Sequence, residues 1–151
     1  MKNSTGYTLT EIALVLTILT LLFGVITPVY TSYVNAVKTD TVVDQLQEIS
    51  NAIDKYFLDN GVYPDSLADI FSPVPLDPWG HPYQYLKIMG TPESGLGAMR
   101  KDKNLIPINS DYDLYSMGPD GKSTSPLTAK ISQDDIVRGR NGSFYGVAID
   151  Y

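Results

Sequence analysis

Residue types that often build chemical sites are scarce in this sequence of 151 residues, which contains no cysteine and a single histidine. Without cysteine the chain can form neither disulfides nor thiolate metal sites, and its sequence does not indicate an oxidising or a reducing compartment. Basic residues are also few, because 11 Lys and Arg stand against 17 Asp and Glu for a net charge of -6. That balance argues against a nucleic-acid groove, which needs a basic face to engage phosphates.

Charge is absent from a long stretch near the amino terminus. No charged residue lies between Glu11 and Lys38, and residues 12–29 are just long enough to cross a hydrocarbon core as a helix. Glu11 stands at the start of this run, where a carboxylate costs insertion roughly 2.5 to 3.5 kcal/mol. We therefore expect a partner charge for Glu11. The alternative is a carboxylate that is merely hydrated at the level of the lipid headgroups.

A cleaved secretory signal is the other interpretation of this apolar run. Lys2 is the only basic residue before it, the run is longer than a usual signal core, and no small-x-small cleavage site follows. Pro28 follows instead, and residues 29–37 still read as helix. Pro28 removes the hydrogen bond to the carbonyl of Gly24, so we expect a kink there.

The second part of this helix is amphipathic. Its apolar residues recur every three or four positions, which predicts a stripe covered by a sheet. They are Val42, Val43, Leu46, Ile49, Ile53, Tyr56 and Phe57. Asn60-Gly61 is a typical helix stop. We predict one helix from Tyr7 to Asp59, roughly 80 Å long at 1.5 Å per residue.

The remaining residues predict a small antiparallel sheet. Residues 62–70 indicate a turn and a short capped helix, and Pro73, Pro75 and Pro78 forbid a helix after it. We expect strands at residues 83–89, 112–117 and 144–149, and a loop at 90–104. The predicted fold class is α+β: a long N-terminal helix, transmembrane in its first half and amphipathic in its second, packed on a small antiparallel sheet with a C-terminal loop region.

The amino-terminal sequence resembles a known processing signal. Residues 2–6 end in Gly6, and Tyr7-Thr-Leu-Thr-Glu11 with the apolar run follows, as in the type IV pilins and pseudopilins. This resemblance implies that a prepilin peptidase cuts after Gly6 and methylates Tyr7. It also implies that Glu11 meets the processed amino terminus of a neighbouring subunit, and Pro28 matches the family's proline in the helix. Tyr7 replaces the usual phenylalanine, and Thr10 replaces an aliphatic residue.

Two segments of the head narrow the resemblance to the major pseudopilins of type II secretion. They are Asp77-Pro-Trp-Gly-His-Pro-Tyr-Gln-Tyr85 and Asp111-Tyr-Asp-Leu-Tyr-Ser-Met-Gly-Pro-Asp-Gly121. In that family the terminal loop holds calcium, which implies carboxylate ligands from Asp120, Asp134 and Asp135 and a carbonyl oxygen from Met117. The alternative is that Asp134 and Asp135 cap a helix or lie in solvent. Residues 122–151 form a longer end than the family usually has.

An enzyme is not predicted. Gly121-Lys-Ser123 imitates the end of a phosphate-binding P-loop, but Ser116 stands where the upstream glycine is required and Pro119 removes a backbone donor. His81 lies in a Gly-His-Pro turn with no nucleophile pattern nearby.

The sequence thus predicts a structural subunit of a type II secretion pseudopilus. We expect a leader at residues 1–6, a transmembrane and filament-core helix at 7–29, and a periplasmic head at 30–151. The expected partners are other copies of the chain, prepilin peptidase, an inner-membrane assembly platform and minor pseudopilins, with no nucleic acid. The expected location is the inner membrane, with a single pass, and then a fibre. A type IV pilin for adhesion, motility or DNA uptake, and an anchored binding module that never polymerises, are the alternatives.

Overall fold

The computed structural model describes residues 6–92, 97–103 and 105–151. Part of the loop expected at residues 90–104 lies outside these ranges. The chain divides into two compact units, Met1–Ala36 and Val37–Tyr151.

Helix α1 extends from Leu9 to Asn60 and contains Pro28 without ending there. It ends where the sequence indicates, because Gly61 adopts a positive φ of 74° that glycine tolerates readily. The Gly61 amide donates to the carbonyl of Phe57 at 2.7 Å, and the Asn60 side chain donates to the carbonyl of Tyr56 at 2.8 Å. The prediction of one long helix is confirmed, with small shifts at both ends.

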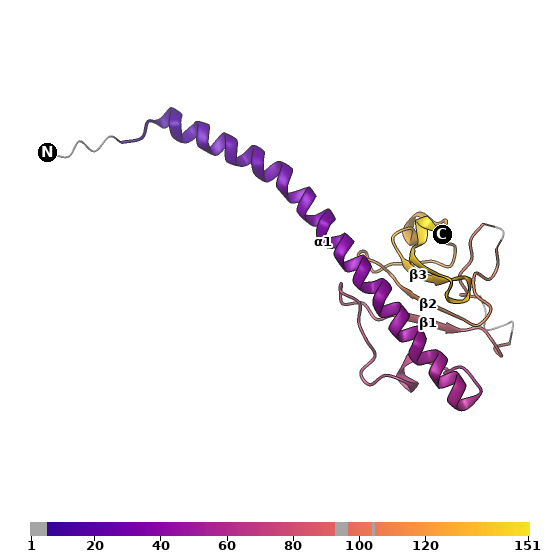
Figure 1. Ribbon diagram of the computed structural model, residues 1–151. Coiled ribbons are helices and arrows are strands. Elements are labelled where there is room, and N and C mark those ends of the chain that lie inside the picture. The colour runs from indigo at the N-terminus through magenta and orange to yellow at the C-terminus, as the bar shows by residue number, and fades with distance from the viewer. Residues whose placement is uncertain (1–5, 93–96, 104) are drawn as a thin grey trace. The chain divides into compact units, whose positions relative to one another are not determined.

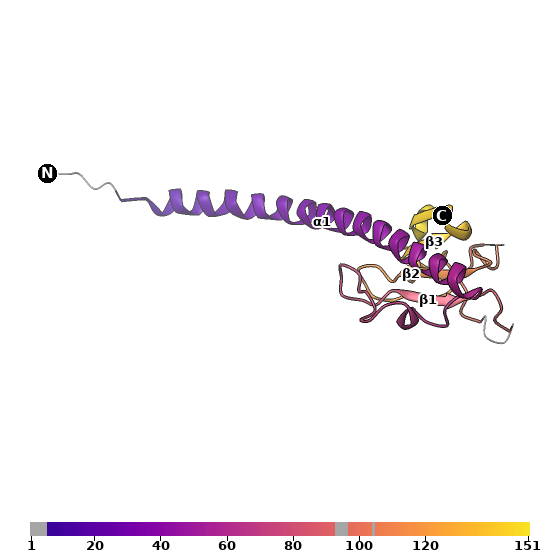
Figure 2. The same ribbon diagram turned by 60° about the horizontal axis from the view of Figure 1, so that its bottom comes forward.

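Four short strands follow and form one antiparallel sheet in the order β1-β2-β3-β4. They are β1 (Gln84–Lys87), β2 (Tyr112–Ser116), β3 (Ile136–Gly139) and β4 (Phe144–Val147). Gln84 pairs with Tyr115, Tyr115 with Val137, and Ile136 with Val147. In both views the second section of α1 lies along the sheet (Figures 1 and 2). The predicted α+β class is confirmed.

Strand β3 is the element that the sequence-based prediction lacks. All four of its residues are buried, and one of them is Arg138. A short run containing a buried arginine shows no alternation of apolar and polar residues, so it does not look like a half-exposed strand. The short helix expected at residues 62–70 is present as the 3-10 turn Leu67–Asp69, where the Asp69 carboxylate accepts the Ser66 amide at 2.8 Å.

The core of Val37–Tyr151 has two parts, one on each face of the sheet. The predicted stripe of α1 forms the first, since its central residues are buried against the sheet, and the second lies under the C-terminal segment. The first contains Val42, Leu46, Ile49, Ile53, Leu67, Tyr83, Tyr112, Leu114 and Ile136; the second contains Ile108, Leu127, Val137 and Ala148. Consecutive residues Ile136 and Val137 enter different clusters, as successive strand residues should.

Candidate functional site

The two residues of the expected cleavage site precede helix α1. Gly6 and Tyr7 are both exposed and lie outside regular structure, with Tyr7 86% exposed. A Cβ atom built on Gly6 would meet no atom within 4 Å. Within this chain, nothing described covers the peptide bond between them.

Glu11 has a structural task that the sequence analysis missed. Its Oε2 accepts hydrogen bonds from the Thr8 amide at 2.8 Å and the Thr8 hydroxyl at 2.7 Å. The Glu11 amide lies 3.4 Å from the Thr8 hydroxyl oxygen, which accepts from it. Together these bonds form a capping box, and the pattern Thr-x-x-Glu before an apolar helix was its readable signal. The carboxylate is thereby held at the helix start, although neither donor neutralises its charge.

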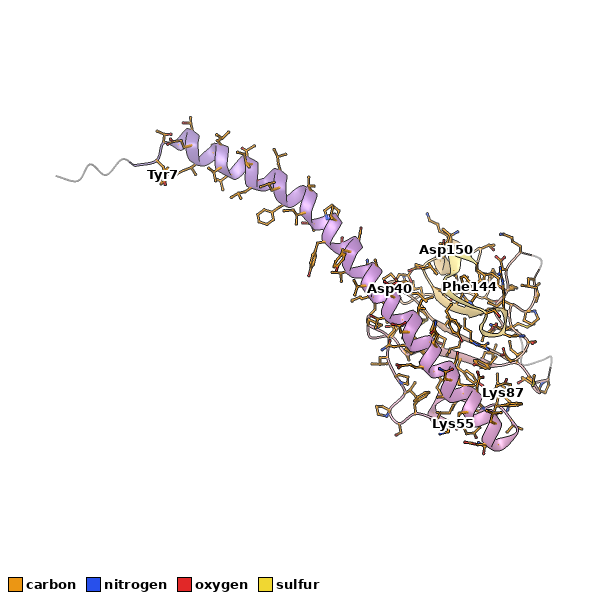
Figure 3. All side chains as sticks on the ribbon, viewed as in Figure 1. Tyr7, Asp40, Lys55, Lys87, Phe144 and Asp150 are labelled. Atoms are coloured by element: carbon orange, nitrogen blue, oxygen red, sulfur yellow. The ribbon has the colours of Figure 1, made fainter. Side chains whose placement is uncertain are left out.

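The apolar side chains after Glu11 are exposed. Helix α1 is long and apolar enough to cross a membrane, and none of its most apolar window is buried. From the labelled Tyr7 onward, the side chains of this first section project from the ribbon (Figure 3). Several of them are about two-thirds exposed, among them Leu21, Phe23, Val25 and Val29. Such a surface is suited to lipid or to other apolar helices.

The threonines of this section satisfy their own hydroxyl groups. Each donates to the carbonyl of the residue four positions earlier: Thr17 to Ala13, Thr20 to Leu16, Thr27 to Phe23 and Thr31 to Thr27, at 2.7 to 3.1 Å. Thr31 also reaches the carbonyl of Pro28 at 3.0 Å. Polar groups in hydrocarbon must be satisfied internally, so these residues do not spoil an apolar surface.

The two head segments that carry the resemblance contact one another. Asp77 Oδ1 accepts the backbone amides of Trp79 at 3.0 Å and His81 at 2.9 Å, while Oδ2 accepts the Ser116 hydroxyl at 2.6 Å. His81 Nδ1 donates to the carbonyl of Gly118 at 3.1 Å. These bonds engage His81 in joining two turns.

The predicted ligands Asp120 and Asp134 lie close together beside a tight turn. Gly118 and Gly121 have φ values of 64° and 65°, and a Cβ on Gly118 would lie 2.4 Å from the Asp134 carbonyl oxygen. Burial raises the pKa of Asp134, and the negative charge of Asp120 raises it further. Asp120 is exposed and accepts the Lys122 amide at 2.8 Å. Half-buried Met117, whose carbonyl oxygen was the fourth expected ligand, directly precedes the turn.

Asp135, the third predicted carboxylate, is instead fully buried beside the guanidinium of Arg100. Its Oδ2 accepts hydrogen bonds from the Arg100 guanidinium and, at 2.6 Å, from the Ser123 hydroxyl. Burial raises the pKa of Asp135 to about 6, against the lowering effects of Ser123 and Arg100. The guanidinium also donates to Ser123 Oγ at 2.6 Å and to the Thr124 carbonyl at 2.7 Å.

The residues as placed therefore do not fit a calcium ion held by three carboxylates. Among the described residues no three Asp, Glu or His side chains are grouped so that they could hold a metal. Two like unit charges 4 Å apart repel each other by about 4 kcal/mol at an effective dielectric of 20. The repulsion between a divalent cation and the guanidinium at that distance would be twice as large. Calcium binding stays a prediction, and Arg100 is the residue that the sequence analysis missed.

A second buried ion pair supports the sheet. Arg138 donates to both oxygens of Asp111, at 2.9 and 2.6 Å, and lies 4.0 Å from the ring centroid of Tyr112. Burial lowers the pKa of Arg138, but Asp111 more than offsets it, so the pKa is raised overall. This pair holds the end of β3 against the start of β2.

A long amino-terminal helix whose second section packs on a four-stranded antiparallel sheet is the architecture of pilin-like subunits. No family model matches the chain, and no solved structure matches it. Curated relatives do match over most of its length.

Four of these relatives carry the name type II secretion system core protein G. The one from Klebsiella pneumoniae is 31% identical, over 90% of this chain and 94% of the relative. The one from Pseudomonas aeruginosa is 29% identical, over 80% and 87%, and the one from Vibrio cholerae is 28% identical, over 81% and 85%. The chain belongs to this family, the major pseudopilins of type II secretion.

Proposed function

We propose that the chain is a structural, non-enzymatic subunit of a type II secretion pseudopilus. In this proposal prepilin peptidase removes residues 1–6 and methylates Tyr7, and the subunit stays in the inner membrane with its head in the periplasm. An assembly platform then adds subunits at the base of a helical fibre, which pushes secreted proteins toward the outer membrane. The names of the relatives support this proposal over a type IV pilin.

One observation carries the proposal: a single carboxylate is fixed at the start of an exposed apolar helix. The Thr8–Glu11 capping box sets its position, yet leaves the charge without a cation among the described residues of the amino-terminal unit. A new amino group on Tyr7 of a neighbouring subunit supplies such a cation. In a greasy bundle, an attraction of about 4 kcal/mol at 4 Å is enough to select one register.

The capping box allows the charge to be tested apart from the helix start. Glu11→Gln keeps a side chain that can accept the Thr8 hydrogen bonds but removes the charge, whereas Glu11→Ala removes both. If the charge sets register, both variants insert into membranes at the normal level and neither forms fibres. The measurements are the membrane-bound fraction on immunoblots and the yield of sedimentable fibres by electron microscopy.

Fibres from Glu11→Gln at the normal yield would contradict the charge mechanism and leave Glu11 with the capping role alone. Thr8→Ala is the matched control, because it removes the Thr8 hydroxyl but keeps both the carboxylate and the Thr8 amide that donates to it. It should insert and form fibres.

Processing is tested separately by the mass of the chain extracted from its own host. We expect a chain that begins at Tyr7 and carries one added methyl group, and Gly6→Val should retain residues 1–6. A chain beginning at Met1 would favour an anchored module that never polymerises. This result is independent of the Glu11 variants, since it measures cleavage and not assembly.

A further inference from the structure

Arg100 is almost completely buried, and its guanidinium contacts three oxygen atoms and one aromatic ring. Only 1% of the residue is exposed. Its guanidinium donates to Asp135 Oδ2, the Ser123 hydroxyl and the Thr124 carbonyl, and its carbon lies 4.3 Å from the ring centroid of Tyr115. Carboxylate, hydroxyl and carbonyl oxygens are also the ligands that a hard divalent ion takes.

The backbone around Arg100 ties the same loop. The Lys101 amide donates to the Ser125 carbonyl at 3.2 Å, and the Leu127 amide donates to the Lys101 carbonyl at 2.8 Å. The Arg100 amide donates to Asp113 Oδ2 at 2.6 Å, at the start of β2. Three segments far apart in the sequence therefore meet at one arginine.

Asp135 cannot serve Arg100 and an ion shared with Asp120 and Asp134 at the same time. Turning its carboxylate toward Asp120 and Asp134 would leave a buried guanidinium without its counter-charge, which is strongly unfavourable. One observation favours a bound ion: Asp135 Oδ1 is buried and has no hydrogen-bond partner among the described residues. A single oxygen is far short of the six to eight that calcium requires.

We infer that the Arg100 guanidinium is the internal cation that closes the C-terminal loop of the head, so that the head keeps its fold without calcium. The Arg100 side chain thereby takes the place of the calcium ion that the family resemblance implies. The inference concerns the head alone and does not depend on processing or assembly.

The test uses the full chain in detergent micelles and follows the fluorescence of Trp79, the only tryptophan. The melting temperature is measured in EDTA, in calcium chloride and in magnesium chloride, and calcium binding is measured by titration calorimetry. The expected result is one melting temperature in all three solutions and no heat of binding. A calcium-specific rise of several degrees that Asp134→Asn abolishes would overturn the inference.

Substitutions at the cross-link provide the second measurement. Arg100→Met should lower the melting temperature by many degrees in EDTA, while Lys130→Met, which removes an exposed cation from the same loop, should leave it unchanged. Arg100→Met combined with Asp135→Asn should recover part of the loss, because no buried carboxylate is left without its partner. The inference would also be overturned if the decreases in melting temperature of the two single variants added up in the double variant. It would likewise be overturned if Arg100→Met melted at the same temperature as the Lys130→Met control. If Arg100→Met does not fold, the wild-type calcium measurement still decides.

Discussion

In the described part of Met1–Ala36 the side-chain hydrogen bonds of the threonines and Glu11 join residues two to four positions apart. In Val37–Tyr151 several buried ones join distant residues: Arg138 and Asp111 are 27 positions apart, Arg100 and Asp135 are 35, and Ser116 and Asp77 are 39. The first unit can therefore form its polar contacts as soon as its helix forms. The second acquires them only when distant segments meet.

This difference means that the two units present different kinds of surface. The local contacts of the first unit leave its apolar side chains exposed, so its surface is available to lipid or to other subunits. The long-range contacts of the head enclose charge within a closed core. Changes in the head should therefore alter its stability, whereas changes in the first unit should alter assembly.

The largest expected effect is alkaline unfolding confined to the head. Burial raises the pKa of Tyr83, Tyr85 and Tyr112. A tyrosine whose pKa is higher in the folded state gives stability that is full below its ordinary pKa of about 10 and is lost as the pH rises through the folded value. Trp79 fluorescence should therefore report cooperative unfolding above that pH, together with a rise in tyrosinate absorbance.

Far-ultraviolet circular dichroism should retain part of its helical signal there, because the first unit contains no buried tyrosine among its described residues. Tyr85→Phe should move the transition to higher pH. It should also lower stability at neutral pH by about 0.5 to 1.5 kcal/mol, since the hydrogen bond to the Pro64 carbonyl is lost. Tyr30→Phe, at an exposed position, is the control. Tyrosinate absorbance that reached its full amplitude, buried tyrosines included, without any change in Trp79 would contradict the prediction.

Arg138→Met should be the next largest effect. The change leaves Asp111 as a buried carboxylate without its partner, and breaking such a pair costs about 3 to 5 kcal/mol. Urea unfolding of the full chain in micelles measures the loss, with Lys55→Met on the exposed side of α1 as the control. Equal unfolding of the two variants would show that the pair contributes nothing to the head.

The last prediction compares the same substitution, glycine to alanine, in the two units. Gly118→Ala should destabilise the head by about 1 to 3 kcal/mol, because its φ is 64° and the new Cβ would meet the Asp134 carbonyl. Gly24→Ala has open space and a helical backbone, so it should favour the helix by about 1 kcal/mol and leave the head's melt unchanged. Thermal melts of both variants test this. A destabilised head in Gly24→Ala would mean that the two units are not independent.

The elements that the sequence predicted are those with a local pattern. The apolar stripe of α1, the Asn60-Gly61 stop and three of the four strands follow from spacing and turn residues. The capping box at Thr8 and Glu11 had a local signal as well. Strand β3 and the Arg100 cross-link had none, because a buried arginine looks like a surface residue until its distant carboxylate is known. Arg100 also separates the expected calcium ligands, because it binds Asp135, whereas Asp120 and Asp134 lie together beside the turn at Gly118.

The threonine hydroxyls of α1 have a further consequence for any change in the surroundings of that segment. The hydroxyls of Thr17, Thr20 and Thr27 already donate to carbonyls of their own helix, so their hydrogen-bond count is the same in lipid as among neighbouring protein helices. Lipid tails and aliphatic side chains are also similarly apolar. Leaving the bilayer for a bundle would require no hydroxyl to exchange partners. The free energy of that step would depend on shape, close contact and the single charge of Glu11.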